Sequence, residues 1–182
     1  AYGLRELQTG RAPAYTTRFK MAWADDSLYF GITCDEKDMG NLNIASKRDG
    51  DPVIWRGDCV ELLLEPPGHS YYQIAIDPAG HVVDLDRKKG LEMRWSSDAE
   101  VAVHHGDSAW TLEVRVPVAG PGHDVLNPLS GVSGRRPTQT NTWFFNVCRQ
   151  RVRGEVMQRS AFSPTGKPGF HDLMKFAEMY VR

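Results

Sequence analysis

The sequence lacks any apolar run approaching the roughly 20 residues of a transmembrane helix, so we expect no membrane span. It also has little excess charge of either sign, because 22 Lys and Arg stand against 23 Asp and Glu, giving a formal net charge of −1. This balance excludes the basic surplus typical of nucleic-acid-binding domains. The phosphate-binding patterns GxxxxGK[ST] and GxGxxG and the nucleophile motif GxSxG are missing as well.

Cysteine is scarce, and its three copies cannot all pair within one chain. The sequence has no CxxC motif and no Cys/His cluster, which argues against a structural zinc site. Each cysteine lies in an apolar or alternating stretch, so one disulfide with a free thiol and three buried thiols remain equally open. These residues are Cys34, Cys59 and Cys148.

The 182 residues, 41% of them hydrophobic, are enough for one domain with a sizeable core. We therefore expect a single domain over residues 1–182. Because the chain begins with Ala1 rather than Met, we interpret it as a domain excised from a longer protein or as a processed form.

Alternating apolar and polar residues dominate the chain, and no convincing amphipathic helix interrupts them. This pattern predicts an all-β antiparallel β-sandwich of about nine to ten strands. Long loops are expected at 35–52 and at 119–141, the second with room for one helical turn. The expected strands are 19–23, 28–34, 58–65, 71–77, 81–86, 101–103, 110–116, 142–150, 157–163 and 175–181.

Two pairs of acidic residues are the nearest approach to a catalytic motif, namely Asp58 with Glu61 and Asp84 with Asp86. A glycoside hydrolase needs two carboxyl groups about 5–10 Å apart across a cleft. Spacings of two or three residues on a strand are common at solvated edges, so a non-catalytic protein is favoured.

Glu61 stands in the middle of a strongly apolar strand. Burying a carboxylate there costs several kcal/mol unless it is paired or hydrogen-bonded. Two interpretations are equally open: an internal ion pair with an arginine such as Arg149, or a hydrogen-bond acceptor at a ligand site.

Trp55 precedes the same strand at the end of the long loop, close to Asp58. An indole face at such a junction belongs either to the core or to a platform on which a sugar ring stacks. Asn146 and Arg149 interrupt another apolar strand in a similar way. Trp23, Trp110 and Trp143 alternate with apolar neighbours and are predicted to be core residues.

Several segments, taken in order, resemble the family 9 carbohydrate-binding modules, which are DOMON-like β-sandwiches. The matching segments cover nearly the whole chain. They are AWADDSLYFGITCDE, IWRGDCVELLLE, YYQIAIDPAGHV, WTLEVRVP, WFFNVCRQR and SAFSPTGKPGFHDLMKFAEM.

The resemblance implies a site in which two aromatic rings sandwich a terminal sugar. Trp55 and Glu61 match the first aromatic and a carboxylate of that site, while Asn146 and Arg149 match its Asn-x-x-Arg. Phe162 stands where the family has its second Trp, and Asp58 is expected at the rim. The family's arginine on the strand YYQIAID has no counterpart there, because Gln73 and its neighbours carry no positive charge.

The resemblance further implies non-catalytic binding of a mono- or oligosaccharide or of a polysaccharide end, with no nucleic-acid or membrane partner. It implies a bacterial protein that is extracellular or periplasmic, with a catalytic domain beside this module. Some members carry structural calcium, for which the acidic loop Asp35, Glu36 and Asp38 offers oxygen ligands. No other cofactor is expected.

Two alternatives keep the fold and change the function. One is a structural or protein-interaction module, in which Glu61 and Arg149 form only a buried ion pair. The other is a haem-binding DOMON-like domain with axial Met or His ligands. Its candidate ligands are Met21, Met93, His81 and His171.

Overall fold

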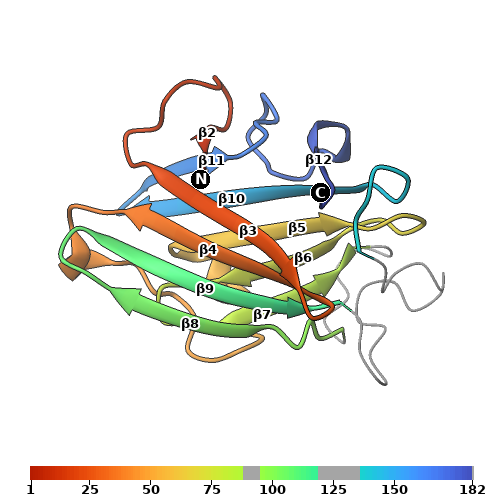
Figure 1. Cartoon of the computed structure of the whole chain (residues 1–182). Helices are drawn as coiled ribbons and strands as arrows, with labels where there is room; N and C mark the ends of the chain where they lie inside the picture. Colours follow the sequence, from red (N-terminus) through yellow and green to blue (C-terminus); the bar gives the residue numbers. More distant parts are fainter. Residues whose placement is uncertain (88–94, 119–135, 182) are drawn as a thin grey trace.

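The computed structural model describes residues 1–87, 95–118 and 136–181, and places two antiparallel sheets face to face (Figure 1). The first sheet runs in the order β1 (Tyr2–Gly3), β3 (Thr17–Ala24), β4 (Ser27–Asp35), β9 (Ala109–Pro117) and β8 (Glu100–His105). The second runs β2 (Arg5–Glu6), β11 (Val156–Ala161), β10 (Trp143–Arg153), β5 (Cys59–Glu65), β6 (Tyr72–Ile76) and β7 (Val82–Asp86), with β12 (Ala177–Met179) also pairing with β10.

Among the described residues, three short 3₁₀ helices connect these strands and there is no α-helix. They are η1 (Met39–Asn41), η2 (Pro52–Arg56) and η4 (Leu173–Lys175). None of them is long enough to cross a membrane, and no described helix has the length and apolarity to do so. The predicted antiparallel β-sandwich is therefore confirmed.

All ten predicted strands are present, and the structure adds β1 and β2. Each added strand has two residues, which is too short for an alternating pattern to register in the sequence. The predicted hairpin turn is also found, because Ala24 pairs with Ser27 and leaves a two-residue loop. Asp25 and Asp26 there have φ angles of 47° and 53°, the left-handed conformation that a type I′ turn requires.

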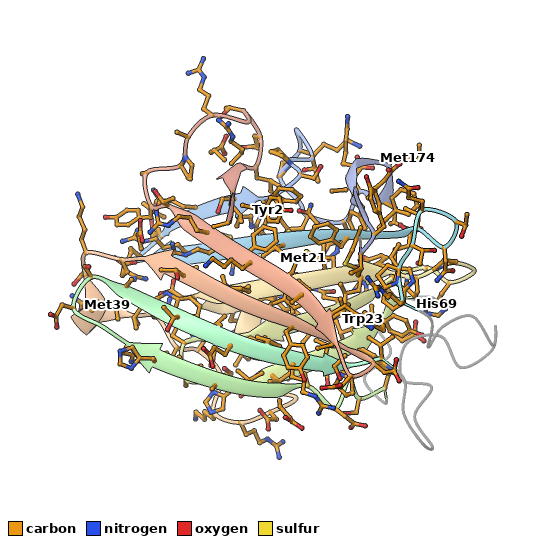
Figure 2. The ribbon with its side chains drawn as sticks, in the orientation of Figure 1. Tyr2, Met21, Trp23, Met39, His69 and Met174 are labelled. Carbon is orange, nitrogen blue, oxygen red and sulfur yellow. The ribbon has the colours of Figure 1, made fainter. Side chains whose placement is uncertain are left out.

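The space between the sheets is filled as the alternation predicts. Val60, Leu62 and Leu64 of β5 point into this core, where they join buried side chains of the other sheet. Trp110 and Trp143 are fully buried, as predicted. Trp23 is half-buried and meets Trp143 edge to face at a centroid distance of 6.3 Å. Figure 2 shows Trp23 and Met21 on β3, with Tyr2 close by.

The opposite, outer face of β5 is buried too, which a two-layer sandwich does not by itself require. Cys59, Glu61 and Leu63 are each at most 2% exposed. Cys59 packs with Ile54 and Trp55 of η2, whereas Leu63 packs with Phe170 from the chain after β11. Two connecting segments therefore form a partial third layer over the second sheet, and the polar residues beneath them are enclosed.

All three cysteines are free and buried, so the structure has no disulfide bond between them. Burial raises the pKa of Cys34 to about 11 and raises the pKa of Cys59 and Cys148 well above the ordinary thiol value. The question left open by the sequence is thereby answered in favour of three buried thiols. The predicted loop at 119–141 lies mostly outside the described residues, as does Met93.

The carboxylates of the acidic loop after β4 are bonded to protein side chains. Glu36 is fully buried and accepts hydrogen bonds from Arg151 at 2.6 and 3.0 Å and from Arg153 at 2.7 Å. Asp35 pairs with Arg18, and Asp38 accepts a hydrogen bond from Asn41. Across the described ranges no three metal-binding side chains come together. The loop therefore does not fit the calcium site considered for it.

Glu36 also links the two sheets, since it follows β4 of the first sheet and its arginine partners lie on β10 of the second. Burial raises the pKa of Glu36. The hydrogen bonds from Arg151 and the Asp38 N–H, together with the charges of Arg151 and Arg153, outweigh burial and hold that pKa at about 2. The carboxylate is consequently ionised throughout the neutral range.

Replacing Glu36 with Gln is expected to lower the free energy of unfolding by about 3–5 kcal/mol at neutral pH, because it leaves the buried Arg151 without its counter-charge, whereas Arg153 keeps Asp58. The Glu36 contribution is fully present above its ordinary pKa of 4.5 and is lost as the pH falls toward about 2. Urea unfolding across this range should therefore show the two proteins converging. The control is Asp35→Asn, which breaks an exposed pair worth less than about 1 kcal/mol. Equal losses in the two variants would contradict a linking role for Glu36.

Candidate functional site

The loop before β5 is shaped so that Trp55 lies over the outer face of the second sheet. Asp51 begins η2 by accepting a hydrogen bond from the Val53 N–H at 3.2 Å, and Pro52 supplies a backbone angle suited to a first turn. Gly57 ends η2 where a Cβ atom would lie 2.4 Å from the Asn43 carbonyl oxygen. A side chain at residue 57 would force these backbones apart and shift η2.

Gln150 of β10 fastens η2 to the sheet. Its Nε2 donates to the carbonyl oxygens of Trp55 and Gly57 at 2.7 and 3.0 Å. Its Oε1 accepts from Arg159 Nε at 3.2 Å, and Arg159 in turn donates to the Pro168 carbonyl at 2.6 Å. One side-chain pair on neighbouring strands therefore anchors both η2 and the segment after β11.

Glu61 and Gln73 lie beside this pair on the same face of the sheet. Gln73 Nε2 donates to Glu61 Oε2 at 2.6 Å, and both side chains are 2% exposed. β5 pairs with β10 on one side and with β6 on the other. The sheet thus supplies a floor made of one carboxyl and two carboxamide groups.

A third group of side chains closes the site. Arg87 directly follows β7, and its N–H donates to the Tyr71 carbonyl at 3.0 Å. Arg87 Nε also donates to the Tyr71 hydroxyl at 3.1 Å, and that hydroxyl lies 2.9 Å from His171 Nδ1. The strand β7 and the segment after β11 are therefore joined across the site by Tyr71.

Together these residues enclose a pocket of about 290 Å³. Its volume is at the small end for ligand sites and suits one ring rather than an extended chain. It combines aromatic surface, a buried carboxyl group and guanidinium groups, which is a composition that can bind a polar ring. The lining residues are Trp55, Glu61, Gln73, Arg87, Gln150, Arg159, Gly169, Phe170 and His171.

Glu61 has an unusual acidity. Burial raises its pKa, and the hydrogen bond from Gln73 and the charge of Arg159 only partly offset this, so the pKa is raised to about 7. His171 shifts the other way, because partial burial and the charges of Arg87 and Arg159 lower its pKa to about 4. Near neutral pH the pocket therefore holds a half-ionised carboxyl group, a neutral imidazole and two positive charges.

Of the residues singled out in the sequence, Trp55 and Glu61 lie together in this pocket. The suggested ion pair between Glu61 and Arg149 is wrong, because these side chains lie on opposite faces of the sheet. Glu61 is aligned with Cys148 of β10, so the next residue, Arg149, points to the inner side. There Arg149 donates to Thr17 Oγ1 and to the Asp35 carbonyl at 3.2 and 3.0 Å.

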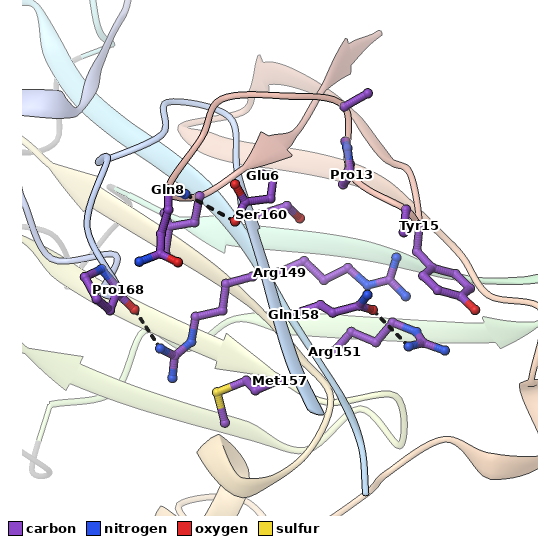
Figure 3. A pocket seen from close by; sticks show the side chains of 14 residues that line it. Glu6, Gln8, Pro13, Tyr15, Arg149, Arg151, Met157, Gln158, Ser160 and Pro168 are labelled. Carbon is purple, nitrogen blue, oxygen red and sulfur yellow. Dashed lines mark hydrogen bonds between the residues drawn. The ribbon is translucent and has the colours of Figure 1, made fainter. Parts of the chain in front are cut away.

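Arg149 instead contributes to a second hollow of about 360 Å³ beside β11 (Figure 3). Arg151 lies in the same hollow, with its guanidinium 3.6 Å from the centre of the Tyr15 ring and bonded to Gln158. Arg159 lines both the hollow and the pocket. Because these arginines are largely hydrogen-bonded to other residues of the protein, we assign the hollow beside β11 a structural role.

Asp58 belongs to the buried network of Glu36 and Arg153 rather than to the rim of the pocket. It accepts hydrogen bonds from the N–H groups of Asn43 and Val152 and from Arg153 at 2.6 Å. It is 2% exposed. Since Asp58 directly follows Gly57, its role in the structure is to fix the end of η2.

Asn146 and Phe162 also fall outside the pocket. Asn146 is fully buried and exchanges two hydrogen bonds with the backbone of Ser163, at 2.8 and 3.0 Å. Phe162 packs into the inter-sheet core, stacked on Phe145 at a centroid distance of 5.5 Å and edge-on to Phe19. The aromatic ring beside the pocket on this side of the chain is Phe170 instead.

The pocket contains a cation that the sequence reasoning missed. The family resemblance places this arginine on the strand 71–77, whereas in this chain Arg87 follows the return strand of the β6–β7 hairpin, directly opposite Tyr71. The turn signal Pro78-Ala79-Gly80 would have been enough to establish this pairing. Phe170 gave no comparable signal, because its segment has no regular period, and His171 was predicted only as a candidate haem ligand.

The candidate haem ligands are engaged elsewhere or belong to different parts of the fold. His81 Nδ1 lies 3.0 Å from Asp77 Oδ2, and His171 Nδ1 is bonded to Tyr71. Met21 lies on β3 of the first sheet.

Comparison with protein-family models and with curated proteins gives no match. Among solved structures, a candidate carbohydrate-binding protein from Bacteroides uniformis aligns with a TM-score of 0.69 and 16% identity, covering 97% of this chain and 84% of that one. A family 9 carbohydrate-binding module from Caldicellulosiruptor kristjanssonii aligns with a TM-score of 0.63 in two complexes. The glucose complex is 12% identical over 100% of this chain and 84% of that one, and the cellotriose complex is 13% identical over 98% and 80%.

The fold is that of the family 9 carbohydrate-binding modules. The ordered resemblance seen in the sequence is thus confirmed for the fold. At these identities the family 9 likeness rests on how the strands are arranged rather than on shared side chains. The pocket of this chain must therefore be judged on its own residues.

The pKa of Glu61 predicts a pH dependence of stability. Between the ordinary value of 4.5 and about 7, the unfolded chain loses its proton while the folded protein keeps it. The Glu61 contribution to the free energy of unfolding should therefore fall as the pH rises through this window, by on the order of 3 kcal/mol in total. His171 acts in the opposite direction between about pH 4 and 6.5, because its lowered pKa keeps it neutral in the folded protein. Urea unfolding at several pH values should therefore show the Glu61 contribution as a fall in the wild-type free energy of unfolding relative to that of Glu61→Gln. The exposed Glu113→Gln variant on β9 should retain it, and a pH dependence in Glu61→Gln identical to that of the wild type would refute the assignment.

Proposed function

We propose that the pocket around Trp55 and Glu61 binds a sugar ring without transforming it. The observation that carries the proposal is the meeting of an indole, a buried carboxyl group and two arginines in one pocket of about 290 Å³. The fold supports it as well, since the module with the same fold from Caldicellulosiruptor kristjanssonii is in complex with glucose and with cellotriose.

The chemistry of a pyranose suits this arrangement. Its axial C–H groups pack on the half-buried face of Trp55, while its hydroxyl groups exchange hydrogen bonds with Glu61 and the guanidinium of Arg87. Phe170, rather than Phe162, supplies aromatic surface from the segment after β11. Because one ring makes few contacts, we expect modest affinity once the entropic cost of association is met.

Binding without catalysis follows from the number of acids in the pocket. Glycoside hydrolysis generally uses two carboxyl groups flanking the scissile bond. Among the described residues that line the pocket, Glu61 is the one carboxyl group. A ring held there has an acceptor or a proton donor within reach, but the described part of the chain offers it no second carboxyl partner.

Asp58, Asn146, Arg149 and Phe162 enter this proposal as residues that hold the frame of the site rather than as ligand contacts. Asp58 has the most direct influence, because its hydrogen bonds from the N–H groups of Asn43 and Val152 hold the chain immediately after Gly57, where η2 ends. Asn146 ties β10 to the start of the segment that carries Phe170.

We further propose that the module acts beside a catalytic domain in a secreted or periplasmic bacterial protein. A weak one-ring site gains value in that setting, since tethering raises the effective concentration of the catalytic domain at a polysaccharide. The ligand in that case is a chain end or a short oligosaccharide.

The decisive experiment is a glycan array followed by calorimetry with any sugar that binds, including glucose and cellotriose. Trp55→Ala should weaken binding at least about tenfold, because it removes the stacking surface. The variant should remain folded, since Gln150 bonds to the backbone carbonyl of residue 55 and not to its side chain. Phe144→Ala is the control, as this aromatic residue is 37% exposed and outside the pocket.

A blank array with well-folded protein would reject sugar binding and favour the structural or protein-interaction module. An array hit whose affinity is equal in wild type and Trp55→Ala would place the sugar elsewhere on the molecule.

A further inference from the structure

Behind the pocket, three side chains form a short hydrogen-bonded chain from Arg87 through Tyr71 to His171. Arg87 Nε donates to the Tyr71 hydroxyl at 3.1 Å, and the same hydroxyl lies 2.9 Å from His171 Nδ1. Arg87 and His171 line the pocket, whereas Tyr71 is 5% exposed and is not among the lining residues. Tyr71 is therefore placed to act on a ligand through its neighbours.

The direction of these hydrogen bonds follows from the chemistry of the three groups. A guanidinium N–H can only donate, so Tyr71 accepts from Arg87. The Tyr71 hydroxyl keeps its proton, because burial raises its pKa above the ordinary value of 10. Within the described residues His171 Nδ1 is the acceptor placed for that proton. His171 Nδ1 must then be the unprotonated nitrogen of the ring.

A neutral imidazole has one proton, and the nitrogen that does not accept must carry it. Partial burial and the charges of Arg87 and Arg159 keep the pKa of His171 at about 4, so the ring is neutral at ordinary pH. The proton therefore resides on Nε2. The structure describes no hydrogen bond from this Nε2–H to another residue, which leaves it available to a ligand.

Gln73 provides the opposite polarity on the floor of the same pocket. Its Nε2 is committed to Glu61, and among the described groups its buried Oε1 has no hydrogen-bond partner. A buried acceptor left unpaired costs about 1–3 kcal/mol, which a ligand that donates to it would recover. The pocket thus holds an unused acceptor at Gln73 and an unused donor at His171.

We propose that Tyr71 is a positioning residue that keeps the ring proton of His171 on Nε2. His171 then donates a hydrogen bond to the sugar, whereas Gln73 Oε1 accepts one, so Tyr71 sets the hydrogen-bonding polarity of the pocket. The proposal rests on the sugar-binding function above and narrows its ligand class. The preferred ligand is a ring with neighbouring hydroxyl groups, one donating to Gln73 and another accepting from His171. A ring that lacks either hydroxyl leaves one of these groups unpaired and binds more weakly.

The test begins with Tyr71→Phe, which keeps the ring packed against Phe176 and His171 and removes only the hydroxyl. Affinity for glucose, or for the best sugar from the array, should fall about three- to tenfold. Nitrogen-15 NMR of the free protein should show His171 protonated at Nε2 in the wild type and a mixture of the two neutral forms in the variant. Tyr180→Phe, outside the pocket, should change neither reading.

A second variant separates positioning from general damage. His171→Gln places an amide N–H near the position of Nε2, and this donor does not depend on Tyr71. Adding Tyr71→Phe to His171→Gln should then cost less than about twofold in affinity. The proposal would be overturned if the affinity loss of the double variant equalled the product of the losses in the two single variants. It would also be overturned if wild-type His171 were protonated at Nδ1.

Failure of the sugar-binding function is distinguishable from failure of this assignment. If no glycan binds the wild type, the ligand class falls with the function. The NMR spectrum of the free protein still decides whether Tyr71 fixes the protonated nitrogen of His171.

Discussion

The buried carboxylate of Glu36 is the interaction on which the rest of the arrangement depends. It crosses from the end of β4 to Arg151 and Arg153 of β10, so it joins the two sheets at one end of the sandwich. Arg153 also donates a hydrogen bond to Asp58, and Asp58 accepts hydrogen bonds from the backbone N–H groups of Asn43 and Val152. Because only Gly57 separates Asp58 from the end of η2, one ionic network connects the two sheets and also holds the chain next to Trp55.

The pocket exists because the second sheet is covered on the side that would ordinarily face water. η2 and the segment after β11 both lie on that face, and Gln150 and Arg159 fasten one to the other through the sheet. Polar residues that would be harmless on an open face become costly when they are enclosed. The raised pKa of Glu61 reflects this cost, and so does Gln73 Oε1, which has no hydrogen-bond partner among the described groups.

The strands were predictable from the sequence because their period of two is a strictly local property. Glu61 and Trp55 stood out for a similar reason, as a carboxylate in an apolar run and an indole at a loop end are unusual on their own. The pairing of Glu61 with Arg149 failed because the sequence does not reveal how β5 and β10 are aligned. One position of register decides whether two residues share a face or lie on opposite faces.

Residues delivered by loops were beyond the same reasoning. Phe162 and Phe170 are eight positions apart in an irregular segment, and only the folded path shows that the first enters the core and the second reaches the pocket. Arg87 was accessible in principle, since a hairpin turn fixes which residues face each other. Gln150 gave no signal, because its bonds are to backbone atoms whose position depends on η2.

The double attachment made by Gln150 and Arg159 has a consequence for the energetics of recognition. Both walls of the pocket are tied to adjacent strands of one sheet before any ligand arrives. Binding of a ligand to such a preorganised site would not require these segments to become ordered, so the protein would lose little conformational entropy. Under the proposed function, association of a ring with this pocket would then mainly require desolvation and orientation of the ring, as expected of rigid-body binding to a preformed site.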